Sequence, residues 1–132
     1  MNQNTRKVVF NMSCPFCSNN LNILKENDLA YAIYDKYPVN KGHVLIIPKR
    51  HVSNYFQCRP EERAAMDCLL FECREMLQHS YSPEGFNVGI NCGEAAGQTI
   101  FHVHVHLIPR FKGDMDDPRG GVRGVIPDKR VY

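Results

Sequence analysis

The side chains best suited to chemistry in this 132-residue chain are three histidines at alternate positions, His102, His104 and His106. Successive side chains of a β-strand point to opposite faces, so a strand over residues 101–107 would place all three imidazoles on one face. The other face would carry four apolar side chains, those of Phe101, Val103, Val105 and Leu107. Imidazoles that leave water need hydrogen-bond or metal partners. We therefore interpret this stretch as part of a functional site and not as a half-solvated strand.

Two kinds of chemistry fit this row of imidazoles. A neutral imidazole is a good nucleophile towards phosphorus, and its pKa of about 6.5 leaves much of it unprotonated at neutral pH. Neighbouring histidines could then bind phosphate oxygens or pass a proton to the leaving group. Alternatively, a His-x-His pair could chelate a metal that activates water, although the nearby paired carboxylates of a two-metal phosphatase are missing from the sequence.

A second group of candidate ligands is the pair Cys14 and Cys17 in a Cys-Pro-Phe-Cys motif. This spacing fits half of a zinc site, a redox pair or a chance occurrence. The redox interpretation favours the start of a helix, and the Ser-Asn-Asn that follows Cys17 is a poor helix start. Three further cysteines lack paired spacing and are interpreted as structural thiols: Cys58, Cys68 and Cys73.

Isolated polar residues next to apolar runs are further candidates. Asp35 could accept hydrogen bonds from ligand hydroxyls or could simply form a turn with its own backbone. His43 is either satisfied in the core or part of a site, and His51 is a surface residue unless other ligands pair with it. The loop over residues 92–98 contains two glycines and could turn backbone N–H groups towards a phosphate.

The elements that must position these residues follow from local patterns. Short apolar runs at residues 21–26 and 29–34 flank Asn-Asp and predict a β-hairpin, and residues 42–48 and 85–91 predict two more strands. Helical spacing of apolar residues predicts a long helix from Pro60 to about His79. Because no βαβ alternation is visible, we expect an α+β domain in which a helix covers one face of an antiparallel sheet.

Composition narrows the class of protein. A chain of 132 residues, 43% hydrophobic and 23% charged, predicts a single globular domain over residues 1–132, with a core at about 14–110. The tail at 111–132 is rich in Gly and Pro, so it is either a frayed end or an arm that packs on a partner or pocket. The net charge of +2 and the lack of a long apolar run predict no nucleic-acid partner, no membrane partner and no signal peptide. We expect a cytoplasmic protein with mostly reduced cysteines.

The run His-Val-His-Val-His-Leu-Ile at residues 102–108 is similar to the motif of the histidine triad (HIT) family. The segment from Asp35 to Val44, Asn91, and Gly97-Gln98-Thr99 also resemble this family, and the similarity extends from about Cys14 to Arg110. The Pro-Arg after the triad and the C-x-x-C resemble the bacterial branch that is similar to diadenosine polyphosphate hydrolases. The family fold implied is a five-stranded antiparallel sheet with one long helix, usually paired into a homodimer.

The resemblance also implies roles for individual residues. His104 would attack the α-phosphorus of a nucleotide and form a nucleotidyl-histidine intermediate, which water then hydrolyses. His106 would bind phosphate oxygens and help the leaving group, and His43 would support the triad from the neighbouring strand. Implied nucleotide contacts are Gln98 and Thr99 at the phosphate, Asn91 at the sugar-phosphate, Asp35 at the ribose hydroxyls, and Phe16, Leu21 and Ile33 at the base.

Some HIT proteins pair a C-x-x-C with two histidines around zinc, and the matching residues here are Cys14, Cys17, His51 and His102. Such a closed Cys₂His₂ set suits a structural metal, because no coordination position remains open. The resemblance thus favours a dinucleoside polyphosphate hydrolase or transferase with structural zinc and no organic cofactor. The alternatives are a nucleoside phosphoramidase, a nucleotide-binding or signalling protein with little hydrolysis, and a zinc-dependent hydrolase.

Overall fold

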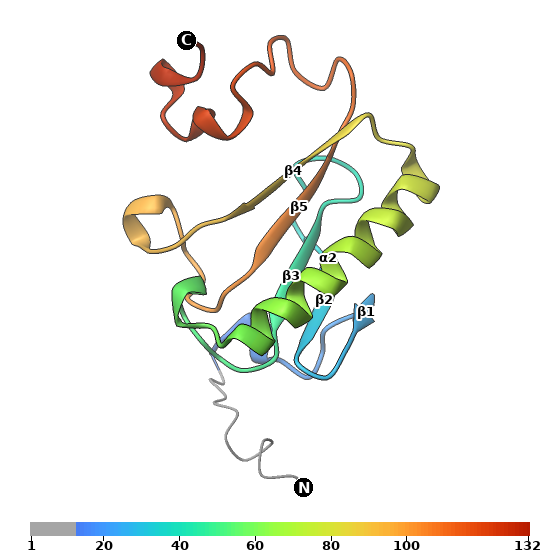
Figure 1. Ribbon diagram of the computed structural model, residues 1–132, viewed down its shortest axis with the longest axis vertical. Coiled ribbons are helices and arrows are strands. Elements are labelled where there is room, and N and C mark those ends of the chain that lie inside the picture. The colour runs from blue at the N-terminus through green and yellow to red at the C-terminus, as the bar shows by residue number, and fades with distance from the viewer. Residues whose placement is uncertain (1–12) are drawn as a thin grey trace, which may run out of the picture.

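The fold is a five-stranded antiparallel sheet crossed on one face by a single long helix (Figure 1). A computed structural model describes residues 13–132. The strands are β1 (Lys25–Glu26), β2 (Ala30–Tyr34), β3 (Val44–Pro48), β4 (Gly85–Ile90) and β5 (Val105–Arg110), in the order β1-β2-β3-β5-β4. The predicted α+β class is confirmed.

The helix α2 (Pro60–Tyr81) begins and ends where local chemistry favours it. Proline suits the first turn because it has no N–H to leave unpaired. The backbone N–H of Arg59 donates to Glu62 Oε1 at 2.8 Å, a reciprocal contact of the capping-box kind. Ser82, in the left-handed conformation with φ of 49°, ends the helix.

The central strands are apolar at successive positions, and side chains alternate between the faces of a sheet, so both faces of this sheet are apolar. One face, which includes Ala32, Val44 and Ile46, packs against a helix stripe formed by Met66, Leu69, Cys73 and Leu77. The opposite face, which includes Ile33, Leu45 and Ile47, packs against the first described turn, η1 (Pro15–Cys17). Burial from both sides explains why β3 is a nearly continuous apolar run.

The predicted hairpin, central strand, helix and fourth strand are all present, with different ends. The first strand is only two residues long, and the helix runs two residues beyond His79. Cys58 and Cys73 are buried as expected for structural thiols, whereas Cys68 is exposed on the helix. Short 3-10 turns fill the connections: η2 (Tyr55–Gln57), η3 (Glu94–Ala96), η4 (Gly121–Val125) and η5 (Pro127–Lys129).

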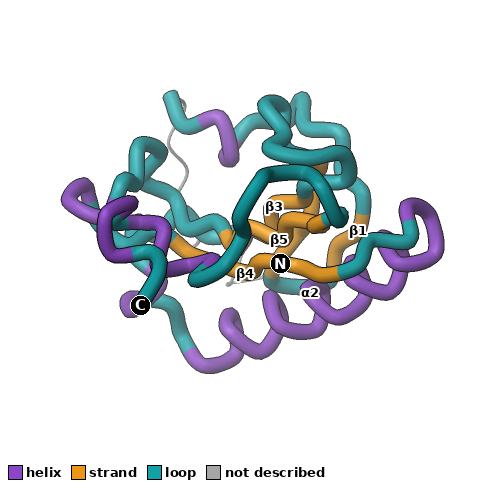
Figure 2. Tube along the Cα trace, turned by 90° about the horizontal axis from the view of Figure 1, so that it is seen from above, coloured by secondary structure: helices purple, strands orange, loops and turns teal. Residues whose placement is uncertain are grey.

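The tail after β5 is held by hydrogen bonds and is not frayed. Figures 1 and 2 place it beyond β4, on the side of the sheet away from β1, and η4 contacts β4. The Arg130 guanidinium donates to the carbonyl oxygens of Asp117 and Arg119. Gly120 has a φ of +88°, and a Cβ there would lie 1.9 Å from the Arg130 carbonyl oxygen, so the tail closes on itself through a position that needs glycine.

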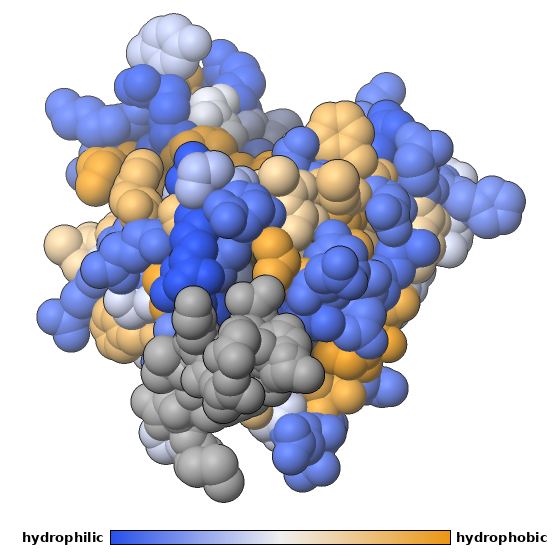
Figure 3. All heavy atoms as spheres, turned by 60° about the horizontal axis from the view of Figure 1, so that its bottom comes forward, coloured by the Kyte–Doolittle hydropathy of each residue, from blue (hydrophilic) through white to orange (hydrophobic). Residues whose placement is uncertain are grey.

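The surface is mixed in character. Figure 3 shows hydrophilic and hydrophobic residues interleaved over the face in view. Among the described residues, no helix has the length and apolar content needed to cross a membrane.

Candidate functional site

The four predicted metal ligands meet at one point on the face of the sheet opposite the helix. Cys14 directly precedes η1, Cys17 is its last residue, His51 follows β3, and His102 precedes β5. The Sγ of Cys14 lies 3.5 Å from His102 Nδ1, and the Sγ of Cys17 lies 3.3 Å from His51 Nδ1 and 3.6 Å from His102 Nδ1. The two histidine Nδ1 atoms are 3.1 Å apart. Ligands separated by 88 residues in the sequence therefore converge on one small volume.

These separations suit a tetrahedral zinc ion. Sulfur at about 2.3 Å and nitrogen at about 2.0–2.1 Å from a tetrahedral zinc lie roughly 3.3–3.8 Å from one another. The separations found here run from 3.1 to 3.6 Å. His102 Nε2 donates to the Pro48 carbonyl oxygen at 2.7 Å, which turns the Nδ1 lone pair towards the cysteines. Burial lowers the pKa of His102 to about 4, so the imidazole is in the neutral form that binds metal.

The triad does not lie in one regular strand. β5 begins only at Val105, so the predicted strand over 101–107 is corrected: His102 and His104 precede it, and Phe101 is exposed where an apolar contact was expected. The reason is a long-range bond, because the N–H of Val103 donates to the Val52 carbonyl oxygen at 2.9 Å instead of pairing with a strand. The histidines still form a contiguous row, with ring centroids of His104 and His106 5.2 Å apart.

Hydrogen bonds give each histidine of the cleft a defined tautomer. His104 Nδ1 lies 2.8 Å from the His102 carbonyl oxygen, which can only accept, so Nδ1 carries the proton and Nε2 keeps a free lone pair. The backbone N–H of Val39 donates to His43 Nδ1 at 3.0 Å, so the proton of neutral His43 is on Nε2. That Nε2 lies 2.9 Å from His106 Nδ1 and donates to it, which leaves the proton of His106 on its own Nε2.

The electrostatic surroundings keep the supporting histidines neutral. Burial, with added repulsion from His104 and His43, lowers the pKa of His106 to about 4. Burial likewise lowers the pKa of His43, although Asp35 opposes the shift from 3.4 Å away. A neutral His106 with its proton on Nε2 is a hydrogen-bond donor towards the cleft.

A cleft of about 930 Å³ opens beside this row. It is lined by His104, His106 and all three predicted base contacts, Phe16, Leu21 and Ile33, and also by Asp35, Asn91 and Thr99. The volume is in the range of small-molecule sites. The structure therefore brings together eight of the residues that the sequence assigned to catalysis or nucleotide binding.

Asp35 forms the predicted turn contact and also lies at the cleft. Its Oδ1 accepts the N–H of Tyr37 at 2.9 Å, which is the turn-forming contact, and its side chain also lines the cleft. Its neighbours Lys36 and Tyr37 line the cleft as well, although the sequence analysis did not select them. Both are ordinary loop residues in the sequence, and only the folding of the loop over the cleft reveals them.

Gln98 is placed differently from the expectation that it orients the phosphate. Its side chain is 3% exposed and does not line the cleft. The amide nitrogen donates to the carbonyl oxygens of Ser53 and Ile100 at 2.6 and 3.1 Å, and the amide oxygen accepts the N–H of Gly93 at 2.8 Å. These three contacts with backbone groups tie the loop before the triad to the segment after His51.

Two backbone groups of the site could not be predicted from the sequence. The N–H of Val39 and the carbonyl of Pro48 each fix the proton of one histidine. Since every residue type supplies a carbonyl and all but proline an N–H, no side-chain pattern could have identified them.

Solved structures share this fold. A HIT family protein from Bacillus anthracis superposes with a TM-score of 0.73 at 34% identity, covering 78% of this chain and 77% of that one. A Zn-bound histidine triad family protein from Mycobacterium smegmatis superposes with a TM-score of 0.71 at 35% identity, covering 78% of each chain.

Sequence relatives include enzymes. A 16.1 kDa HIT-like protein of Mycoplasma pneumoniae is 38% identical over 107 residues, which are 77% of this chain and 74% of the relative. An AP-4-A phosphorylase of Mycobacterium tuberculosis is 34% identical over 93 residues, 70% of this chain and 48% of that protein. An asymmetrical bis(5'-nucleosyl)-tetraphosphatase of Schizosaccharomyces pombe is 36% identical over 89 residues, 67% of this chain and 49% of that protein. The chain thus spans about half the length of these two enzymes.

The family assignment follows from a match of residues 18–113 to the HIT domain, which includes the triad and the loop that carries Asp35 and His43. The resemblance seen in the sequence is confirmed, and this chain belongs to the HIT domain family.

Proposed function

We propose that this protein is a nucleotide hydrolase or transferase that cleaves at an α-phosphate through a nucleotidyl intermediate on His104. The observation that carries the proposal is the contact of His104 Nδ1 with the His102 carbonyl oxygen, because it leaves the Nε2 lone pair free in a residue that lines the cleft. An imidazole fixed in this tautomer is a nucleophile without any proton transfer.

In the first step, His104 Nε2 forms a bond to the α-phosphorus while the bond from that phosphorus to the leaving-group oxygen breaks. His106 Nε2–H donates to the phosphate oxygens or to the departing oxygen, and its other nitrogen is supported by His43. In the second step, water attacks the phosphorus and releases a proton to solvent, the P–N bond breaks, and His104 leaves as the neutral imidazole with its Nε2 lone pair restored. The product of hydrolysis is a nucleoside monophosphate, and a different acceptor in place of water makes the reaction a transfer.

The remaining residues of the cleft bind the nucleotide in this proposal. Asp35 accepts from the ribose hydroxyls, Asn91 contacts the sugar-phosphate, and Thr99 contacts the phosphate. Phe16, Leu21 and Ile33 form the apolar surface for the base. Gln98 supports the phosphate loop through its backbone contacts.

Dinucleoside polyphosphates are the proposed substrate class. The names of the Mycobacterium tuberculosis and Schizosaccharomyces pombe relatives both describe reactions at such compounds. An Arabidopsis thaliana relative, 38% identical over 91 residues, is an adenylylsulfatase, so the leaving group is the part of the proposal to be measured first.

Zinc is the proposed resident metal, bound by Cys14, Cys17, His51 and His102. The ligand separations and the zinc-bound relative from Mycobacterium smegmatis support this assignment. The ion would supply a rigid link between the N-terminal turn and the triad, and no step of the reaction passes through it. We also propose the homodimer typical of the family, which light scattering at several concentrations would test.

The deciding experiment compares rates on dinucleoside polyphosphates, nucleoside phosphoramidates and nucleotide sugars, with trapping of the covalent intermediate by rapid acid-free quench and mass spectrometry. We expect His104→Ala to abolish turnover, by at least about 10³-fold, while nucleotide still binds. The intermediate should map to His104 in the wild-type protein. Full turnover by His104→Ala, or an adduct on another residue, would reject the mechanism.

A further inference from the structure

The loop between β2 and β3, residues 35–43, carries a predicted nucleotide contact at one end and the supporting histidine at the other. It is closed by two backbone bonds, from the Asp35 N–H to the His43 carbonyl oxygen at 2.9 Å and from the His43 N–H to the Asn40 carbonyl oxygen at 3.2 Å. Inside this loop, the N–H of Val39 is the group that occupies His43 Nδ1. Asp35 Oδ2, in the same loop, lies 3.4 Å from His43 Nε2 and favours a proton on that nitrogen as well. The position of the loop therefore decides which nitrogen of His43 carries the proton.

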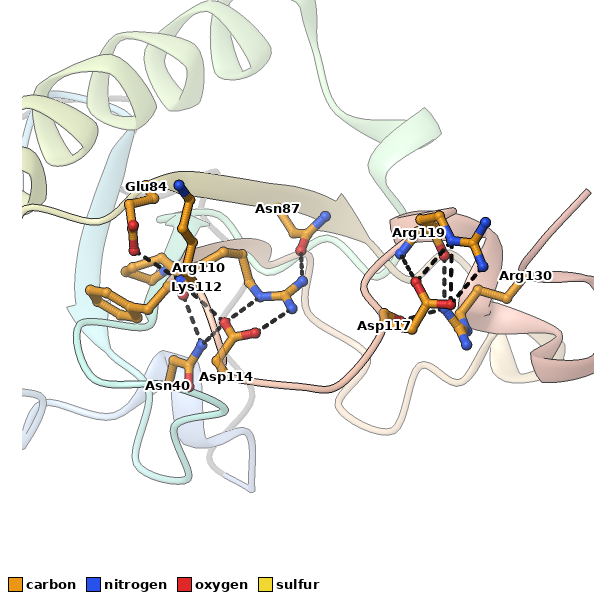
Figure 4. A network of polar contacts seen from close by, with 11 residues as sticks. Asn40, Glu84, Asn87, Arg110, Lys112, Asp114, Asp117, Arg119 and Arg130 are labelled. Atoms are coloured by element: carbon orange, nitrogen blue, oxygen red, sulfur yellow. Dashed lines mark hydrogen bonds and ion pairs between the residues drawn. The ribbon is translucent and has the colours of Figure 1, made fainter.

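The start of the C-terminal tail holds this loop from outside (Figure 4). Asn40 Nδ2 donates to the Pro109 carbonyl oxygen at 3.0 Å and to Asp114 Oδ2 at 2.9 Å. Next to it, the Lys41 ammonium lies 4.9 Å from the centre of the Phe111 ring. The amide nitrogen of Asn40 thus joins one loop to both the last strand and the tail.

Asp114 is itself held in place. Its two oxygens accept from Arg110 Nε and Nη2 at 2.8 and 2.7 Å, and Oδ2 also accepts the N–H of Phe111 at 3.0 Å. Arg110 Nη1 donates to Asn87 Oδ1 in β4 at 2.6 Å. Arg110 and the Phe111 N–H hold the pKa of Asp114 well below its usual range, so the carboxylate stays an acceptor for Asn40.

We propose that Asn40 and Asp114 are positioning residues of the site: together they hold the Val39 N–H against His43 Nδ1 and so select the tautomer in which His43 donates to His106. The tail contributes to the site through Asp114, without reaching the cleft itself. The route is Asp114 to Asn40, then Val39 to His43, then His106. The link to turnover rests on the proposed function, whereas the tautomer is a property of the free protein.

The His43 tautomer and the rate of turnover are therefore measured in separate experiments. Protein labelled with ¹⁵N in its histidines is studied without nucleotide, and the ring nitrogen shifts of His43, assigned with a His43→Gln variant, report its tautomer. In wild-type protein we expect the proton on Nε2. In Asn40→Ala and in Asp114→Ala we expect a mixture of both tautomers, and a kcat lowered by about five- to tenfold with KM changed by less than about twofold, as for loss of about one hydrogen bond.

Asp117→Ala is the matched control. Asp117 is the other carboxylate of the tail that pairs with arginine, binding Arg119 at 3.0 Å, and its contacts lie within the tail (Figure 4). It should leave both the His43 tautomer and kcat as in wild type. The double variant Asn40→Ala/Asp114→Ala should shift the His43 tautomer no further than Asn40→Ala alone, because that single variant already lacks the contact with Asp114.

Three results would overturn the inference. One is a wild-type tautomer in both single variants, with melting curves that show folded protein. Another is a fall in kcat without any change in the tautomer, which would place the effect on another route. The third is an equal tautomer change in Asp117→Ala. If wild-type protein turned over no nucleotide, the proposed function would fail while the tautomer result would still stand or fall by itself.

Discussion

At the scale of single residues, the histidines differ because each has a different ring nitrogen occupied by the protein. His102 uses Nε2 for a carbonyl and keeps Nδ1 for the cysteines, whereas His104 uses Nδ1 for a carbonyl and keeps Nε2 for the cleft. His106 accepts at Nδ1 and donates at Nε2. Three identical side chains at alternate positions thus expose different ring atoms, as their proposed roles of metal ligand, nucleophile and hydrogen-bond donor require.

Cys14→Ser should remove the metal. A serine hydroxyl is a poor zinc ligand, so we expect zinc content to fall from about one ion per chain to a small fraction, and the melting temperature to fall with it. Elemental analysis and calorimetry measure the two effects. Cys68→Ser, at an exposed helix position, is the control and should keep both values. Unchanged zinc in Cys14→Ser would exclude this site.

Gln98→Ala should lower the free energy of unfolding, because the Gln98 side chain holds backbone groups together. The change removes three partly buried hydrogen bonds and leaves the Ser53 carbonyl and the Gly93 N–H without this partner, so a loss of about 1–3 kcal/mol in the free energy of unfolding is expected. Urea unfolding measures it. A large loss of turnover with unchanged stability would instead support direct phosphate contact.

At the scale of the elements, an ion pair joins the start of α2 to the loop after β3, which carries His51. The carboxylate of Glu62, in the first turn of α2, accepts hydrogen bonds from Nε and Nη2 of Arg50, both at 2.8 Å. Arg50 directly precedes His51. Burial raises the pKa of this carboxyl, but the bonds from Arg50 and the Arg59 N–H outweigh it and lower the pKa below the usual value. The same carboxylate therefore caps the start of the helix and anchors the loop that carries His51, a proposed metal ligand.

Glu62→Gln should cost about 2–4 kcal/mol in the free energy of unfolding, because it leaves the partly buried Arg50 without its charge partner. Glu75→Gln is the matched control: its pair with Arg74 is exposed, and removing that pair should change stability by less than about 0.5 kcal/mol. Chemical denaturation of the three proteins at pH 7 makes the comparison. Equal losses of stability in the two variants would show that the Glu62–Arg50 pair contributes no more than an exposed ion pair.

Sequence reasoning succeeded where the signal was local. The apolar run of β3 and the periodic stripe of α2 were predicted because strand burial and helical spacing are properties of neighbouring residues. The start of β5 and the contacts of Gln98 were not, since they depend on Val52 and Ser53, which lie 51 and 45 residues away in the chain. The site residues came largely from the family resemblance, and their assigned roles stay predictions, as do the homodimer and the cytoplasmic location.

At the scale of the whole molecule, the buried histidines couple folding to pH. The pKa of His106 is about 4 in the folded protein and about 6.5 in an unfolded chain. Between these values the unfolded state binds more protons, so stability falls as pH decreases from about 6.5 to 4. His43, whose pKa is also lowered, adds to the same trend.

We therefore expect the free energy of unfolding of wild-type protein to decrease from pH 7 to pH 5, by on the order of 1–2 kcal/mol from His106 after allowance for its partial exposure. Denaturation at fixed metal content measures the slope. His106→Gln lacks the titrating group and should show a shallower dependence. A stability that rose on acidification would contradict the assignment of a neutral, buried pair.

The two uses of His102 have a consequence for how such a site can change over time. Its side chain belongs to the cysteine cluster, but the oxygen that fixes the proton of His104 belongs to its main chain. Any amino acid at position 102 would supply that oxygen. A lineage could therefore lose the metal ligand by substitution at this position and still inherit the acceptor for its nucleophile, so metal binding and the orientation of the reacting nitrogen are free to drift apart even though one residue provides both.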